Sequence, residues 1–162
     1  MKRLILVAVA ICAFVLTANL SLAQDPDAVI LTIDGKTSGG SPRDFTARQL
    51  ESLGLTTIET TTPWHDGKIK FEGVAMQRLL KEVGAAGDKA AVVALNNYRT
   101  EIPLEDFARY PVILALKKDG ADMPVSDKGP LFVIYPYDSS RELKSQLFYA
   151  RSAWQVRKIT IE

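Results

Sequence analysis

The residues best suited to chemistry are concentrated in one stretch, Ile58–Gly73, with the sequence IETTTPWHDGKIKFEG. It combines three consecutive threonines, a Pro-Trp pair, the single histidine of the chain and an Asp-Gly pair typical of a turn. A hydroxyl nucleophile needs a base beside it, and the base needs a third group to orient it. His65 and Asp66 are adjacent, and adjacent side chains usually point apart. The sequence therefore favours an exposed histidine in a turn over a preformed catalytic pair.

The chain offers few ligands for a metal ion. Stable sites need several nitrogen, oxygen or sulfur ligands at convergent spacing, whereas this chain has one histidine and one cysteine, Cys12. Asp119 and Asp122 flank a turn, but the alternating acids and closing glutamate of a calcium loop are absent. The chain also lacks a G-x-S-x-G nucleophile motif. We therefore predict no dedicated metal site and no catalytic residue, while paired carboxylates remain open.

A binding site for a flat ligand fits the residues better. Trp64 follows a proline in a turn, where an indole is often half exposed. Two further groups combine aromatic, cationic and amide side chains: Asn97, Tyr98 and Arg99 at a hairpin tip, and Tyr135, Tyr137, Tyr149, Arg151 and Trp154 near the C-terminus. Heteroaromatic rings stack on indole and phenol faces and need hydrogen-bond partners at their edges. For Tyr135 and Trp154, the alternative is a place in the hydrophobic core.

The N-terminus has the pattern of a secretory signal peptide. Lys2 and Arg3 precede the apolar run Leu4–Leu16, and Ser21–Ala23 supplies small residues for cleavage. The run is shorter than the ~20 residues of a membrane span, so the sequence favours cleavage over a retained anchor. We predict a signal peptide over residues 1–23, one domain over residues 24–162 and a periplasmic location.

Net charge and cysteine content limit the classes of binding partner and the bonds that the chain can form. The chain has 20 Lys and Arg against 19 Asp and Glu, and losing Lys2 and Arg3 with the leader leaves it almost neutral. Such a balance predicts no nucleic-acid partner. Cys12 would also leave with the leader, so the exported chain would have neither a disulfide nor a thiolate ligand. An exported protein without disulfides fits a bacterial periplasm.

Short elements alternate along the predicted domain. We expect strands at residues 29–33, 56–62, 68–71, 90–95, 98–102, 112–116 and 131–135, and a final strand with a bulge towards residue 161. Helices are expected near residues 45–50, where Thr46 and Gln49 can form a capping box, at 74–83, and briefly after Pro103. Residues 137–149 look irregular. The result is an α+β domain with mixed, mainly antiparallel sheets and two or three short helices.

Four segments in this order resemble the molybdopterin-binding domain of the sulfite oxidase family. They are FEGVAMQRLL, which resembles a W-x-G-V-P-L-x-x-L-L helix entry, then NNYRTEIPLEDF, DGADMPVSDKGPLFVIYP and AWQVRKITI. The resemblance covers nearly all of the chain after the leader. It implies the mixed α+β fold of that family.

This chain differs from the family at the position of the metal ligand. Enzymes of the family hold molybdenum through a cysteine in a C-x-x-x-W type turn, and the corresponding position here is Thr60. A threonine hydroxyl is a poor substitute for a soft thiolate. Small exported relatives without the cysteine resemble periplasmic pterin-binding proteins, which act through a membrane-bound signalling protein such as a cyclic-di-GMP enzyme or a sensor kinase.

The resemblance therefore implies a non-catalytic domain that binds a molybdenum-free pterin. Trp64 would stack on the ring, and Asn97, Tyr98 and Arg99 would lie at the rim. The charge of Arg151 beside Ser152 and Trp154 makes it the candidate for pairing with a polar edge. The full set of predicted binding residues is Thr60, Trp64, His65, Asn97, Tyr98, Arg99, Arg151 and Trp154. Two alternatives remain: an oxidoreductase that retains molybdopterin, and a protein-interaction domain without a small ligand.

Overall fold

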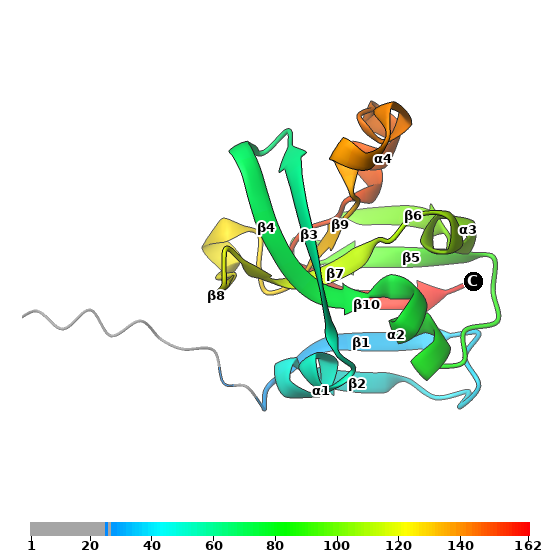
Figure 1. Ribbon diagram of the computed structural model, residues 1–162. Coiled ribbons are helices and arrows are strands. Elements are labelled where there is room, and N and C mark those ends of the chain that lie inside the picture. The colour runs from blue at the N-terminus through cyan, green and yellow to red at the C-terminus, as the bar shows by residue number, and fades with distance from the viewer. Residues whose placement is uncertain (1–24, 26) are drawn as a thin grey trace, which may run out of the picture.

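The computed structural model of the chain describes residue 25 and residues 27–162. The predicted signal peptide, residues 1–23, lies outside them. Within the described part, no helix is long and apolar enough to span a membrane. The described chain forms two sheets with short helices packed around them, which confirms the predicted α+β class (Figure 1).

The first sheet has the strand order β2-β1-β10-β5-β6. Its strands are β1 (Val29–Gly35), β2 (Arg43–Thr46), β5 (Lys89–Ala94), β6 (Arg99–Pro103) and β10 (Val156–Ile161). β1 and β10 run parallel, and the other neighbours are antiparallel. The expected bulge in the last strand is present as a register shift between Val156 and Lys158.

The second sheet is antiparallel and is built on a long hairpin. It has the order β3-β4-β7-β8, and β9 also pairs with β7. Its strands are β3 (Leu55–Thr62), β4 (His65–Ala75), β7 (Ile113–Lys118), β8 (Ala121–Asp122) and β9 (Phe132–Ile134). Figure 1 shows the β3–β4 hairpin crossing in front of the first sheet.

Four α-helices and three 3₁₀ turns connect the strands. The helices are α1 (Ala47–Ser52), α2 (Met76–Glu82), α3 (Leu104–Arg109) and α4 (Gln146–Arg151), and the 3₁₀ turns are η1 (Val125–Asp127), η2 (Tyr137–Ser139) and η3 (Arg141–Leu143). The capping box of α1 is confirmed: Thr46 Oγ1 accepts the Gln49 N–H at 3.2 Å, and Gln49 Oε1 accepts the Thr46 N–H at 2.8 Å.

Several boundaries differ from the sequence prediction, among them those of β4 and the start of α2. β4 covers eleven residues, although only residues 68–71 were expected as strand. The expected helix start at Val74 is wrong, because Val74 and Ala75 still belong to β4. Val74 pairs with Leu55 on one side and with Leu114 on the other. Pairing on both edges extends the strand against the local helical pattern, which is a tertiary effect that the sequence pattern does not contain.

The buried apolar residues form two clusters. The larger cluster joins both sheets and all four α-helices, and it includes Leu31, Leu50, Leu114 and Phe148. The smaller cluster includes Phe71, Ile113 and Phe132, and it lies on the other face of the second sheet because successive strand residues point to opposite faces. Trp64 packs against both clusters.

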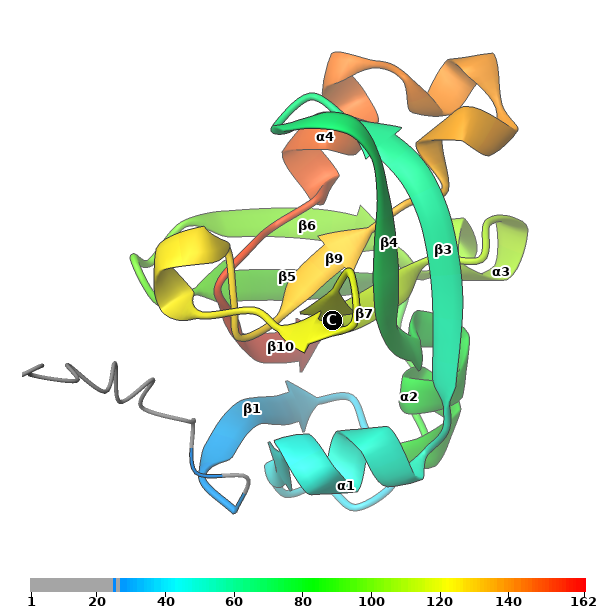
Figure 2. The same ribbon diagram turned by 60° about the vertical axis from the view of Figure 1, so that its left-hand side comes forward.

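A buried polar group anchors α4, which is only six residues long. Asp106 of α3 accepts hydrogen bonds from the Tyr135 hydroxyl at 2.8 Å and from Arg151 Nη1 at 2.7 Å. Burial, followed by the hydrogen bond to Asp106, raises the pKa of Tyr135, so the phenol stays protonated and remains a donor. The three side chains tie the end of α4 to α3 and to the end of β9. Figure 2 shows α4 beside the tip of the β3–β4 hairpin, as Figure 1 also does.

Gly73→Ala should destabilise the fold by about 1–3 kcal/mol, the usual cost of forcing extra volume into a packed site. A Cβ at Gly73 would lie 2.1 Å from the Leu114 carbonyl oxygen and 2.5 Å from Ala115 Cα. Gly39→Ala is the matched control, because a Cβ there meets no atom within 4 Å. Urea unfolding monitored by tryptophan fluorescence compares the two, and an equal effect of both variants would contradict the close approach of β4 and β7.

Asp106→Ala should lower the free energy of unfolding by about 3 kcal/mol, because it leaves a half-buried guanidinium and a buried phenol without their shared acceptor. Asp66→Ala is the control, since Asp66 is exposed. The same urea titration measures both variants. A loss for Asp106→Ala no larger than that of the control would show that the network does not anchor α4.

Candidate functional site

The β3–β4 hairpin reverses direction through only two residues, Pro63 and Trp64, and Thr62 pairs with His65 across the turn. Thr62 Oγ1 accepts the Trp64 N–H at 3.3 Å and lies 2.9 Å from His65 Nδ1. The sequence suggested Asp66-Gly67 as the turn. These residues instead form a bulge within β4, where Gly67 has φ = 72°. The tight connection fixes the direction of the Trp64 indole.

Trp64 is the centre of an aromatic cluster. Its ring centroid lies 5.4 Å from Phe132, 5.5 Å from Trp154, 5.9 Å from Tyr149 and 6.3 Å from Tyr137. The planes are tilted or perpendicular, which is a favourable arrangement for aromatic pairs. The cluster brings together residues from the hairpin tip, β9, η2, α4 and the segment before β10.

A cleft of about 290 Å³ opens beside this cluster. Its lining residues are Trp64, Ala94, Asn96, Tyr98, Gln146, Tyr149, Ala150, Ser152 and Trp154. They come from the hairpin tip, the β5–β6 turn and the C-terminal segment. The Tyr98 hydroxyl donates to the Ala150 carbonyl at 2.9 Å and so links the β5–β6 turn to α4.

The structure thus brings together three of the eight residues that were predicted to bind the ligand. Trp64, Tyr98 and Trp154 all line the cleft. Trp64 and Trp154 are half-buried, and Tyr98 is 46 % exposed. Each therefore combines a fixed position with a free surface, which is the property a stacking wall needs.

Three other predicted residues are sequence neighbours of cleft residues but do not line the cleft. Asn97 sits in the left-handed region at φ = 65°, and its Oδ1 accepts from Arg157 Nη2 at 2.9 Å. Arg99 is exposed on β6 and pairs with Glu162 at 2.7 Å. Arg151, predicted to contact a ligand, is instead directed at Asp106. The structure thus gives all three an internal partner.

Thr60 is fully buried and is closed off by η2. Its Oγ1 accepts the Asp138 N–H at 3.1 Å and donates to the Thr61 carbonyl at 3.3 Å. The Asp138 carboxylate accepts from the Thr61 N–H at 2.8 Å and pairs with Lys144 at 2.6 Å. Hydrogen bonds from Lys144 and Thr61 hold the pKa of Asp138 well below its usual range. The Thr60 hydroxyl is therefore part of a closed hydrogen-bonded seam between β3 and η2.

His65 is not the exposed turn residue that the sequence favoured. Its side chain is 11 % exposed, and its Nε2 lies 3.9 Å from Asp127 Oδ1 without a hydrogen-bond partner among the described residues. Burial lowers the pKa of His65, and the nearby Lys128 and Lys118 lower it further, against a smaller opposing effect of Asp127. The imidazole is thus held in its neutral form beside the hairpin turn.

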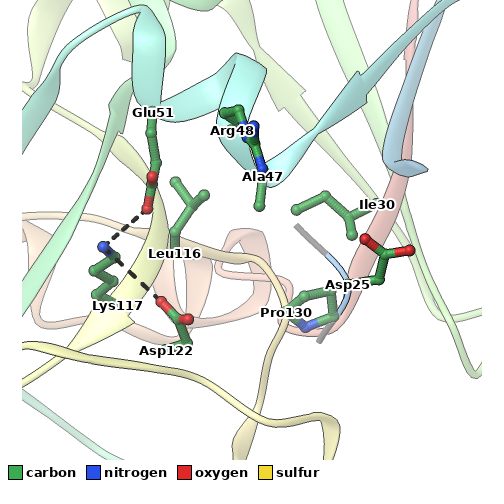
Figure 3. Close-up of a pocket in the computed structure, with 9 residues that line it drawn as sticks. All are labelled: Asp25, Ile30, Ala47, Arg48, Glu51, Leu116, Lys117, Asp122 and Pro130. Carbon is green, nitrogen blue, oxygen red and sulfur yellow. Dashed lines mark ion pairs between the residues drawn. The ribbon is translucent and has the colours of Figure 1, made fainter. Parts of the chain in front are cut away.

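A second cleft, of about 240 Å³, lies between α1 and the β7–β8 hairpin and contains none of the predicted residues (Figure 3). Figure 3 shows Lys117 between two carboxylates, with distances of 2.8 Å to Glu51 and 4.0 Å to Asp122. The charge of Lys117 is therefore already matched within the protein. The aromatic cleft is the better candidate, because its polar groups are less fully engaged.

Sequence reasoning missed Asn96 and Gln146 as cleft residues. Asn96 precedes the residue that was singled out in the same turn. Gln146, Tyr149 and Ala150 share one face of α4 through their i, i+3, i+4 spacing. That spacing was present in a segment expected to be irregular, and it is the signal that could have identified this wall.

The lowered pKa of His65 predicts a pH dependence of stability. The unfolded chain binds a proton near pH 6.5, whereas the folded chain binds it only at lower pH. Neutral His65 therefore makes its full contribution to the free energy of unfolding above about pH 6.5, and this contribution is lost as the pH falls through the lower pKa of the folded state. Between pH 7.5 and 5, His65→Gln should lose less unfolding free energy than the wild type in urea titrations. Identical losses would contradict this account.

Comparison with known protein families gives one match. The family model described as "Oxidoreductase molybdopterin binding domain" matches residues 19–139. The match includes the hairpin with Thr60 and Trp64 and ends at η2, so the α4 wall of the cleft follows it. No curated protein matches the chain. Because the family model covers most of the sequence, this chain belongs to the oxidoreductase molybdopterin-binding domain family.

Proposed function

We propose that this chain is a non-catalytic domain that binds a pterin without molybdenum. The observation that carries the proposal is the aromatic cleft at the tip of the β3–β4 hairpin. The β3 strand of this hairpin carries Thr60, the position that the resemblance matches to the metal ligand of the family's enzymes. Trp64, Tyr149 and Trp154 provide walls for stacking, and Asn96 and Gln146 provide amide groups for the edges of a ring. A cleft of about 290 Å³ suits one compact ring system.

The residues at the family's metal position do not fit a molybdenum centre. Thr60 supplies a hydroxyl where a soft thiolate is needed, and that hydroxyl is already bonded to the backbone of Asp138 and Thr61. Within the described part of the chain, no group of three or more His, Cys, Asp or Glu side chains is placed to hold a metal ion. Binding of the organic ring alone is therefore the function that these residues support best.

We further propose that the protein is exported to the periplasm and acts through a membrane-bound signalling protein, such as a cyclic-di-GMP enzyme or a sensor kinase. The location is supported by the basic, apolar and small-residue pattern of residues 1–23. The partner is supported by the resemblance to small exported relatives without the cysteine. N-terminal sequencing of protein from cells tests the location, since a mature start near Gln24 is expected.

Trp64→Ala should weaken pterin binding at least about tenfold, because it removes the stacking wall and opens the aromatic cluster. Trp64→Phe keeps a ring and should retain more of the affinity. Leu147→Ala is the control, because Leu147 is 56 % exposed on α4 and does not line the cleft. Calorimetric titration with reduced and oxidised pterins measures all four proteins, and circular dichroism checks that each is folded.

Two results would replace the proposal. Stoichiometric molybdenum in the protein purified from its native host, measured by metal analysis, would establish the oxidoreductase alternative. No binding of any pterin at micromolar concentration, with Trp64→Ala indistinguishable from the wild type, would leave a protein-interaction domain without a small ligand.

A further inference from the structure

We infer that the cleft selects uncharged ligands and discriminates against phosphorylated pterins, with Asn96 and Gln146 as the residues that contact the polar edge of the ring. This inference rests on the proposed function and specifies its ligand. None of the nine side chains that line the cleft is charged. The lining is instead aromatic, small or amide-bearing, and that composition sets what the cleft can accommodate.

Two arginines close to the cleft residues in sequence, Arg151 and Arg157, already have partners within the protein. Arg151 pairs with Asp106 at 2.7 Å, and Arg157 donates to the Ala94 carbonyl and the Asn97 side chain. The Lys128 ammonium lies 6.0 Å from the centre of the Trp154 ring but does not line the cleft. Among the described residues, no guanidinium or ammonium group therefore lines the cleft.

Phosphate needs such a group. An anion that leaves water for an aromatic wall loses its hydration, and a charge-assisted hydrogen bond from Arg or Lys is the usual compensation. The uncharged cleft cannot provide this compensation, so a phosphate held against its walls reduces the affinity. A neutral ring carries no comparable desolvation cost.

The two carboxamides are suited to a neutral ring. Asn96 Oδ1 accepts the Tyr98 N–H at 2.9 Å, which leaves its amide N–H groups to donate to a ligand. Gln146 is exposed at the start of α4 and can both donate and accept. Together they can bond to the carbonyl oxygen and ring nitrogens of a pterin without introducing a charge.

The test compares 7,8-dihydroneopterin with its 3′-triphosphate, which share one ring and one oxidation state. Calorimetric titration of the purified chain at about 0.15 M salt, where long-range charge effects are screened, should give at least about tenfold weaker binding of the triphosphate. Asn96→Ala should weaken both ligands by a similar factor, because it removes a contact to the ring they share.

Gln146→Lys should reduce the difference between the two ligands to less than about threefold, because it places an ammonium group at the cleft. Leu147→Lys is the matched control, since it adds the same charge to the next residue, which does not line the cleft. It should leave the wild-type ratio in place.

The outcomes are separable. Equal or tighter binding of the triphosphate by the wild type would overturn the selectivity and leave the proposed function standing. Binding of neither ligand would overturn both. An equal effect of Gln146→Lys and Leu147→Lys would show that general charge, and not the cleft lining, sets the preference, and this too would overturn the inference.

Discussion

The packing of Trp64 is the contact on which the candidate site depends. Its indole is the point at which the two apolar clusters meet, and it sits at the tip of the longest hairpin in the described chain. The two-residue connection and the Thr62 hydroxyl hold it in place from one side. Phe132, Tyr149 and Trp154 hold it from the other. The Trp64 side chain thus both packs against the core and lines the cleft.

The opposite wall depends on polar contacts. A six-residue helix is too short to be stable alone, so α4 must be held by tertiary interactions. Asp106 binds Arg151 at its C-terminal end, Tyr98 binds the Ala150 carbonyl, and the Tyr137 hydroxyl shares a hydrogen bond with Ser152 just beyond. These bonds come from three different parts of the chain. They place the cleft face of α4 opposite the hairpin tip.

Sequence patterns predicted the features that depend only on residues close together in the sequence. The capping box at Thr46, the turn at Asn97 and most strand positions needed only short-range spacing and residue type. The role of Arg151 depends on Asp106, which lies 45 residues away in the sequence. No local sequence pattern indicates that these two side chains form a pair. His65 was misjudged for the same reason: its burial depends on η1, which folds back from a distant segment. The sequence therefore could not predict side-chain pairing and burial that depend on residues far apart in the chain.

The cleft has one more property, which follows from its construction out of three remote segments. A molecule bound there would touch the hairpin tip, the β5–β6 turn and α4 at once. Its binding free energy would therefore oppose local opening of α4, a six-residue helix that depends on tertiary contacts. A ligand in the cleft would thus make α4 more rigid, including the surface at which Leu147 is exposed to solvent. A ligand can change the order of a surface in this way without any change of fold.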